Sequence, residues 1–358
     1  MIEELKRLKK IELHLHLDGS ISINTLQKIS NIEINKLKEK IIANDKCKNL
    51  TEYLSKFDLP LCYMQDKENL KIVARDLIKY LESENIIYAE IRFSPHLHTK
   101  NKLTLDEIVD SILEGLKSNK VKTNIILCMM RNFEFEKNLE IINIAEKYLD
   151  KGVCAIDLAG DENKYPLDNY LELFEIAKEK NIPFTIHAGE NGSFEEIEKA
   201  INIGTKRIGH GVNAINSKEI QQLIKEKDIL LEICPTSNVQ TNAVIFYENH
   251  PIYKFYKDNI KVCINTDNKT ISNISLTEEY IKLYNTFNFS KEDFITMNKY
   301  AIQKAFISDK EKEQLLKELL WNILNNPSSK WGIILYMFNI SITIIIIIII
   351  YTTINIII

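Results

Sequence analysis

Eight short apolar runs, rich in β-branched residues, recur along the chain and are separated by segments long enough to hold a helix. They cover residues 11–17, 86–94, 121–130, 153–160, 183–189, 207–211, 229–235 and 261–267. Between several of them apolar residues return at helical spacing, as in 167–181 and in 193–204, where Gly204 ends the pattern. Strands that alternate with helices form a parallel sheet, and eight of them close into a barrel. We therefore predict the α/β class and a (β/α)8 TIM barrel.

One internal gap and one terminal segment depart from this alternation. The stretch of about 20–85 is too long for a single crossover helix, so we expect a helical insertion after the first strand that covers the barrel mouth. The barrel is assigned to residues 1–326, and residues 327–358 form a hydrophobic, low-complexity tail. The tail is long enough to span a membrane, but its uniform, isoleucine-rich composition favours an extension outside the fold over a tail anchor.

The charge balance and the cysteines limit what the protein binds and where it works. The 358 residues carry a net charge of −4 with the basic residues spread along the chain, so no basic stripe is available for nucleic acid. The six cysteines include no C-x-x-C pair, which favours buried, reduced thiols. The first ten residues lack the apolar stretch of a secretion signal. We expect a cytoplasmic protein that contacts a membrane only if the tail is a true anchor; the sequence is silent on its oligomeric state.

Polar side chains gather at the carboxyl ends of the predicted strands, where barrels of this type build their active sites. His14 and His16 lie two residues apart on the first strand and so point to the same side. His187 ends the fifth run and Asp267 ends the eighth. Three imidazoles and one carboxylate suit zinc and leave a position for water. The same donors also accept iron, cobalt or manganese, so this pattern predicts a metal site without fixing the metal.

Two further groups near this cluster are suited to moving protons. Glu190 follows His187 by three residues, and His210 closes the sixth run. A second H-x-H pair, His96 and His98, follows a proline in what we expect to be a loop. We interpret that pair as two solvent-facing histidines and assign no metal to it.

With these residues in view, the chain resembles the adenosine deaminases, a family within the amidohydrolase superfamily of metal-dependent barrels. The resemblance runs from about Lys10 to about Leu320. It is carried by KIELHLHLDGS, KFD, IRFSPHL, LCMMR, AIDLAGDE, IHAGENGS, RIGHG, EICPTSN and NTDN, in that order. It implies zinc-dependent hydrolytic deamination of adenosine or deoxyadenosine to the inosine product and ammonia, a step of purine salvage.

The resemblance also assigns roles to residues at matching positions. One zinc ion per chain would be held by His14, His16, His187 and Asp267. The catalytic groups would be Glu190, which protonates N1 of the purine, His210, which orients the attacking hydroxide and stabilises the charge that develops, and Asp267, which also orients the hydroxide. The substrate would be bound by His16 and Asp18 near the ribose 5′-hydroxyl, by the backbone N–H of Gly160 at N3, and by Asn268 at N7.

Asn268 is the position that departs from the family pattern, since the usual string N-T-D-D-P reads here N-T-D-N-K. An asparagine amide carries two N–H donors and makes a hydrogen bond to N7 without taking up a proton. The contact is therefore expected to survive, with activity reduced or shifted in base preference.

Two alternatives to adenosine deamination stay open at this level, and a third is disfavoured. The first is a deaminase of adenine or another 6-aminopurine on the same barrel and metal. The second is a catalytically weakened nucleoside-binding homologue, which only Asn268 favours. The third, a zinc deaminase of the cytidine type, is disfavoured because Cys234-Pro235 has no partner at the spacing of a P-C-x-x-C motif.

Overall fold

The computed structural model describes residues 1–324 of the chain. These residues fall into two compact units, which divide after Ile307. The first unit contains all eight strands found in the described residues, and each is parallel to its neighbours. The strands are β1 (Lys10–His16), β2 (Ile86–Phe93), β3 (Lys122–Met130), β4 (Val153–Ala159), β5 (Ile186–Ala188), β6 (Arg207–His210), β7 (Leu230–Ile233) and β8 (Lys261–Ile264).

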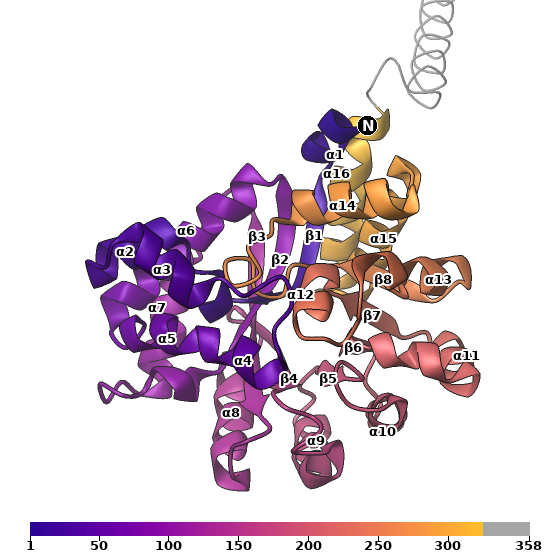
Figure 1. Ribbon diagram of the computed structural model, residues 1–358. Coiled ribbons are helices and arrows are strands. Elements are labelled where there is room, and N and C mark those ends of the chain that lie inside the picture. The colour runs from indigo at the N-terminus through magenta and orange to yellow at the C-terminus, as the bar shows by residue number, and fades with distance from the viewer. Residues whose placement is uncertain (325–358) are drawn as a thin grey trace, which may run out of the picture. The chain divides into compact units, whose positions relative to one another are not determined.

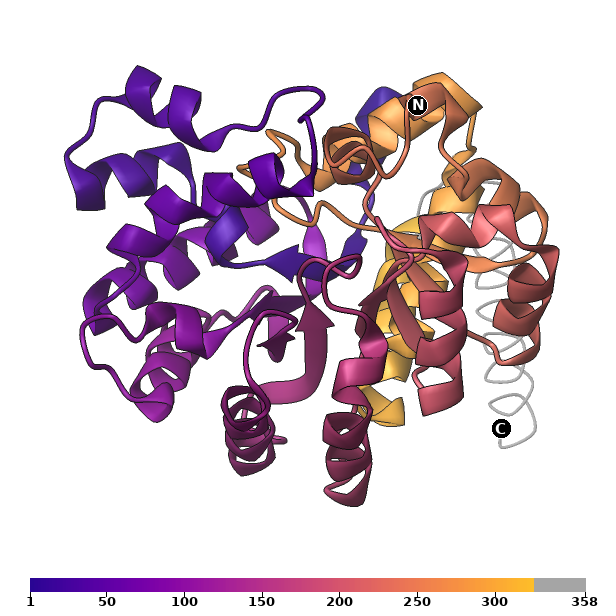
Figure 2. The same cartoon turned by 60° about the horizontal axis from the view of Figure 1, so that its bottom comes forward.

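The strands form two four-stranded sheets in the orders β1-β2-β3-β4 and β5-β6-β7-β8, and backbone hydrogen bonds join the two sheets at both edges. At one edge Leu15 bridges Asp267, with His16 N donating to Asp267 O at 2.7 Å and Asp267 N donating to His14 O at 3.0 Å. At the other edge Ile156 bridges Phe184. The two seams close the ring of strands, which Figures 1 and 2 show at the centre of the first unit. The predicted barrel is confirmed.

Strands in the second half of the barrel are shorter than their apolar runs. The run 183–189, for example, contributes only β5, because Phe184 pairs through an isolated bridge and Gly189 turns the chain with a φ of 66°. An apolar run indicates which residues are buried, and buried residues continue here beyond both ends of the hydrogen-bonded strand.

Helices follow the strands in chain order and surround them in Figure 1. They are α7 (Leu105–Gly115), α8 (Phe135–Tyr148), α9 (Leu171–Glu179), α10 (Phe194–Ile203), α11 (Lys218–Glu226), α12 (Pro235–Gln240), α13 (Ile252–Lys257), α14 (Leu276–Phe287) and α15 (Lys291–Lys304), with α1 (Ile2–Arg7) ahead of β1. Local sequence sets several of their ends. Thr104, Ser275 and Ser290 each form a capping box at the start of a helix, and Gly204 ends α10 in a left-handed conformation.

The long segment after β1 is helical, as expected. It holds α2 (Ile23–Ser30), α3 (Ile34–Ile41), α4 (Leu50–Leu54) and α5 (Asp58–Tyr63), followed by the crossover helix α6 (Lys67–Ser83). Its backbone is bonded to the segments that follow β8 and β7, through Ala43 N to Ile271 O and Cys47 N to Gln240 O at the end of α12. The buried Tyr53 reaches the same place and hydrogen-bonds Ser272 at 2.7 Å. The insertion therefore lies against the mouth that carries the candidate site.

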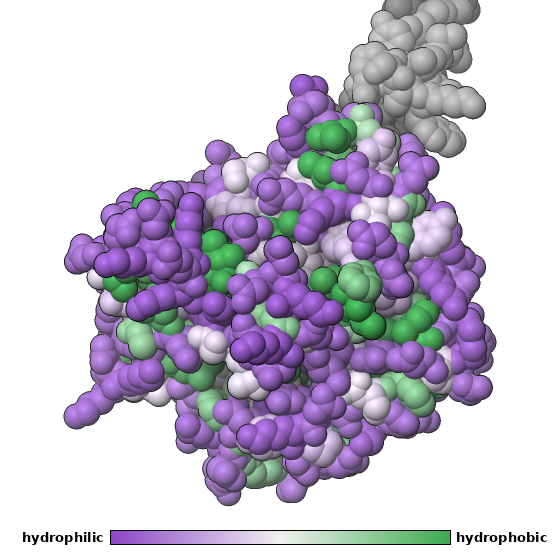
Figure 3. All heavy atoms as spheres, in the orientation of Figure 1, coloured by the Kyte–Doolittle hydropathy of each residue, from purple (hydrophilic) through white to green (hydrophobic). Residues whose placement is uncertain are grey.

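The second unit contains α16 (Asp309–Leu324), and the predicted tail, 327–358, lies outside the described residues. Among residues 1–324, no helix combines the length and the apolar character needed to cross a membrane. The face drawn in Figure 3 is mainly hydrophilic, with small apolar areas between polar side chains. All six cysteines are unpaired, and five of them are buried.

Candidate metal and catalytic site

Three histidines predicted as metal ligands come together at the carboxyl end of the barrel. His14 and His16 extend from β1 and His187 from β5, and their ligand nitrogens all lie within 4.8 Å of one another. The His14 and His187 ring centroids are 4.6 Å apart, and those of His16 and His187 are 5.4 Å apart. The neighbouring Gly209 makes room for them, since a Cβ there would lie 3.1 Å from His14 Cε1.

Asp267, the fourth predicted ligand, stands at the seam between β8 and β1. Its Oδ1 is 3.5 Å from His14 Nε2 and 3.4 Å from His16 Nε2, while Ser237 donates to its Oδ2 at 2.6 Å. Asp267 has a φ of 61°, a left-handed conformation that is uncommon for a residue with a side chain and that concentrates at functional sites. The structure thus brings all four residues to one place.

The inner faces of these histidines fit a metal ion. Nε2 of His14 is buried and has no hydrogen-bond partner, while Nδ1 of the same ring is 2.9 Å from the Glu232 carboxylate. His187 Nδ1 is likewise 2.9 Å from Asp157 Oδ2. A carboxylate behind a histidine fixes the ring and leaves the other nitrogen free to coordinate, which is the usual support of a metal-binding imidazole.

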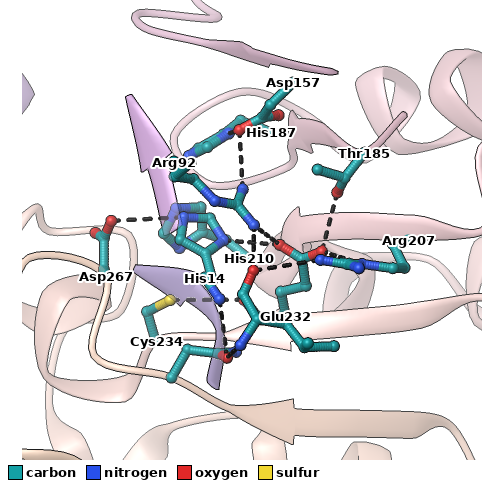
Figure 4. Close-up of polar contacts among 12 residues, drawn as sticks. His14, Arg92, Asp157, Thr185, His187, Arg207, His210, Glu232, Cys234 and Asp267 are labelled. Carbon is teal, nitrogen blue, oxygen red and sulfur yellow. Dashed lines mark hydrogen bonds and ion pairs between the residues drawn. The ribbon is translucent and has the colours of Figure 1, made fainter. Parts of the chain in front are cut away.

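Arg92 connects these two supporting carboxylates. It is fully buried and donates to Asp157 Oδ2 at 2.8 Å and to Glu232 Oε2 at 2.7 Å, the same oxygens that face the two imidazoles. Arg207 continues the network from the other oxygen of Glu232, at 2.6 Å, to Glu90. Figure 4 shows Arg92 between Asp157 and Glu232, with Arg207 on the other side of Glu232.

Sequence reasoning did not assign these supporting residues. A signal was available, because Arg92, Asp157, Arg207 and Glu232 are charges inside otherwise apolar strands. A charge buried in a strand interior requires an opposite charge or a metal nearby.

Glu190 and His210, the two predicted proton-handling groups, face each other beside the histidine cluster. Glu190 Oε2 is 3.7 Å from His210 Nε2, and Thr241 donates to Glu190 Oε1 at 3.1 Å. Burial, and then the negative charges of Asp267 and Glu162, hold the pKa of Glu190 well above its usual range. A raised pKa favours the protonated form of this carboxyl, which is the form able to give a proton.

The residues predicted to bind the substrate follow the carboxyl ends of β1, β4 and β8. Asp18 is buried with its Oδ1 unpartnered, and burial raises its pKa to about 6. Gly160 follows β4 with a φ of 114°, which favours glycine. Asn268 is buried, with its Nδ2 3.2 Å from the Tyr53 hydroxyl and its Oδ1 unpartnered.

The interpretation of the second H-x-H pair as solvent-facing was wrong for His98. His98 is fully buried, and its Nδ1 lies 2.8 Å from the carbonyl of Met64 in the helical insertion. His96 is partly buried, with Nε2 3.1 Å from a Glu140 carboxylate oxygen. The insertion packs over this turn, a contact that a local sequence pattern does not reveal.

A second group of possible ligand atoms shares His14 with the first. It consists of His14, His210 and Cys234, whose ligand atoms also lie within 4.8 Å of one another. Cys234 Sγ lies 3.6 Å from the Glu232 carbonyl oxygen, to which it donates, whereas the first group has Asp267 Oδ1 within 3.5 Å of two of its imidazoles. The triad of His14, His16 and His187 is the better metal site.

Comparison with known proteins places this site in a family context. The family model described as adenosine deaminase matches residues 9–321. The chain is 42% identical over 325 residues to an adenosine deaminase of Clostridium botulinum, which covers 87% of this chain and 98% of that protein. It is 40% identical over 324 residues to an adenosine deaminase of Clostridium perfringens, with the same coverage of both chains.

Solved structures similar to this chain include two that are named as deaminases. The apo N6-methyl-AMP deaminase of Arabidopsis thaliana superimposes with a TM-score of 0.80 at 25% identity, over 89% of this chain and 98% of that one. The ADAL–IMP complex gives a TM-score of 0.81 at 25% identity, over 91% and 100%. An adenine deaminase of Arthrobacter aurescens, at 23% identity and a TM-score of 0.80 over 88% and 99%, shares the fold.

Proposed function

The chain belongs to the adenosine deaminase family, hydrolases that remove the amino group of adenosine, and from that premise we propose how its own residues carry out this reaction. The observation that carries the proposal is the convergence of three imidazoles and one carboxylate beside a buried glutamic acid whose pKa is raised. The donors are His14, His16, His187 and Asp267, and the acid is Glu190.

We propose that these four donors hold one zinc ion per chain. The unpartnered Nε2 of His14 and the carboxylates behind His14 and His187 support this assignment. When bound, zinc lowers the pKa of a coordinated water to about 7 and so makes hydroxide available near neutrality. Ser237, which donates to Asp267 Oδ2, holds that carboxylate in place with its Oδ1 toward the imidazoles.

Glu190 supplies the proton that the purine needs. Its protonated carboxyl donates to N1, which makes C6 electrophilic; water adds to C6, and ammonia leaves after a proton reaches the amino nitrogen. His210, 3.7 Å from Glu190, lies where it stabilises the charge that develops on the attacking oxygen. Thr241 keeps the Glu190 carboxyl in position by donating to its Oε1.

The substrate is a purine nucleoside, and we propose that deoxyadenosine is accepted as well as adenosine. Asp18 and His16 lie at the 5′-hydroxyl of the sugar, the N–H of Gly160 donates to N3, and Asn268 donates to N7. The curated relatives at 40–43% identity favour adenosine over adenine. The similar ADAL structure holds IMP, a purine nucleotide whose base is the deaminated product, which supports a purine beside this cluster.

The cytoplasm is the compartment we propose. Six unpaired cysteines are typical of a protein kept in a reducing environment. Small nucleosides are the partners this site requires, and the net charge of −4 gives no support for nucleic-acid binding.

The test is the absorbance change from adenosine to inosine with the purified full-length chain, before and after chelation. We expect turnover of adenosine and deoxyadenosine that chelation abolishes and zinc restores. Adenine, offered in competition, should be deaminated far more slowly. Turnover that persists in metal-free protein would rule out the proposed role of zinc, and preference for adenine would overturn the substrate assignment.

A further inference from the structure

A row of hydrogen bonds runs from the backbone through two buried side chains to His210. Ile252 N donates to His250 Nδ1 at 3.1 Å, His250 Nε2 is 3.2 Å from Asn238 Oδ1, and Asn238 Nδ2 is 3.0 Å from His210 Nδ1. All three side chains are buried, with exposed fractions of 3% for His250, 0% for Asn238 and 1% for His210. None of these bonds belongs to the network that supports His14 and His187.

The direction of each bond follows from the first. A backbone N–H only donates, so His250 Nδ1 is an acceptor and carries no proton. Burial lowers the pKa of His250 to about 3, so the ring is neutral and its single proton is on Nε2. That N–H donates to Asn238 Oδ1, which turns the Asn238 amide so that its NH2 faces His210.

The last bond then fixes the state of His210. The Asn238 NH2 donates to His210 Nδ1, and a nitrogen that accepts a hydrogen bond here carries no proton. The proton of the neutral imidazole is therefore on Nε2, the nitrogen 3.7 Å from Glu190 Oε2.

We propose that Asn238 and His250 are positioning residues that hold His210 as its Nε2–H tautomer, so that His210 acts toward the reacting atoms as a hydrogen-bond donor. A nitrogen that carries a proton does not ligate a metal, so the same relay keeps Nε2 of His210 out of metal coordination. His210 lies directly beside these ligands, with its ring centroid 4.8 Å from that of His14. The inference rests on the proposed function for the use made of this donor, but the tautomer itself does not depend on turnover.

The direct test reads the protonation of His210 by nitrogen NMR of the full-length, metal-loaded chain labelled in its histidines. The His210 signals are those lost in His210→Gln. We expect Nε2 to be the protonated nitrogen and Nδ1 the unprotonated one. The opposite assignment, or protonation of both nitrogens, overturns the inference whether or not the protein deaminates adenosine.

A nearly isosteric variant reverses the relay. In Asn238→Asp the carboxylate only accepts, so it draws the His210 proton to Nδ1 and leaves a lone pair on Nε2. We expect kcat for adenosine to fall about 100-fold, as for loss of one preorganised donor, with KM within about threefold of the unchanged protein. The assignment of the two His210 nitrogen signals should be reversed, with Nδ1 protonated and Nε2 unprotonated. Retention of kcat within twofold overturns the inference.

A matched control and a second position separate this role from a general effect on folding. Asn216→Asp adds the same charge at an exposed residue after β6 and should leave kcat unchanged. His250→Phe removes both ring nitrogens and should lower kcat about tenfold, whereas His250→Gln keeps a donor near the Nε2 position and should restore most of it. If Asn238→Asp does not fold, equal kcat in the two His250 variants overturns the inference.

Discussion

The Glu162 carboxylate binds the backbone on both sides of Glu190. Its Oε2 accepts from Gly189 N at 2.8 Å, and its Oε1 accepts from Asn191 N at 2.7 Å and from Gly192 N at 2.6 Å. Glycine at 192 permits this approach, because a Cβ there would lie 2.7 Å from the Glu162 Cδ. The charge of Glu162 is also one of the causes of the raised pKa of Glu190.

We therefore predict that Glu162→Gln lowers kcat by about 10-fold to 100-fold. Glutamine has one acceptor oxygen where the loop presents three N–H groups, so the loop that carries Glu190 shifts. Misplacement of a catalytic group by about 1 Å carries a cost of that size. Loss of the charge should also move the alkaline limb of the pH–rate profile to lower pH. Steady-state kinetics across pH measures both effects. Asp161→Asn is the control: its side chain bonds only its own turn, so kcat should stay within twofold, and because its charge raises the Glu190 pKa less than that of Glu162, the alkaline limb should move less.

Glu190 gives the clearest dependence on pH. A carboxyl with a raised pKa is active while it holds its proton, so kcat should be level below that raised pKa and fall as the pH rises through it. Glu190→Gln keeps the shape of the side chain and loses the proton donor. We predict loss of most turnover with metal content close to that of the unchanged protein, measured by metal analysis alongside the deamination rate. Near-normal turnover in this variant would exclude Glu190 as the acid.

The four donors were predictable because each stands at a strand end. In a barrel of parallel strands the carboxyl ends of β1, β5 and β8 lie on one rim. Once eight parallel strands were recognised, the side chains at these ends were expected on that rim. They are His14 and His16 on β1, His187 on β5 and Asp267 after β8.

Residues whose partners lie on loops were not predictable in the same way. The relay from His250 through Asn238 joins the start of α13 to α12, and His98 is buried by the insertion before α6. Nothing in the spacing of these residues along the chain specifies such contacts, which the packing of distant segments creates.

Arg92 should be required both for folding and for metal binding. Replacing it with methionine leaves Asp157 and Glu232 buried without their shared cation, which costs about 3–5 kcal/mol of unfolding free energy. The two imidazoles then lose their fixed supports, and metal affinity should fall about 10-fold to 100-fold. Denaturant unfolding and competition with a chelator measure the two losses. Lys147→Met, which breaks an exposed ion pair with Asp106, should change stability by less than about 1 kcal/mol, and an equal loss in both variants would contradict the special role of Arg92.

Asn268 is the residue at which this chain departs from its family, and its surroundings allow a definite prediction for Asn268→Asp. The amide donates to the Tyr53 hydroxyl, and its Oδ1 has no hydrogen-bond partner. Glycine at position 19 makes room for this side chain, since a Cβ there would lie 2.0 Å from Asn268 Oδ1. An aspartate fits the same space, and burial beside Asp267 favours its protonated form, which donates a hydrogen bond as the amide does. We therefore expect kcat/KM for adenosine to be unchanged or higher by up to about tenfold, with a new loss of activity at alkaline pH as the added carboxyl ionises.

Asn273→Asp, an exposed substitution on the same loop, is the control and should have no such pH dependence. A fall of 100-fold or more in Asn268→Asp at neutral pH would mean that the amide makes a contact with the substrate that a carboxyl does not replace.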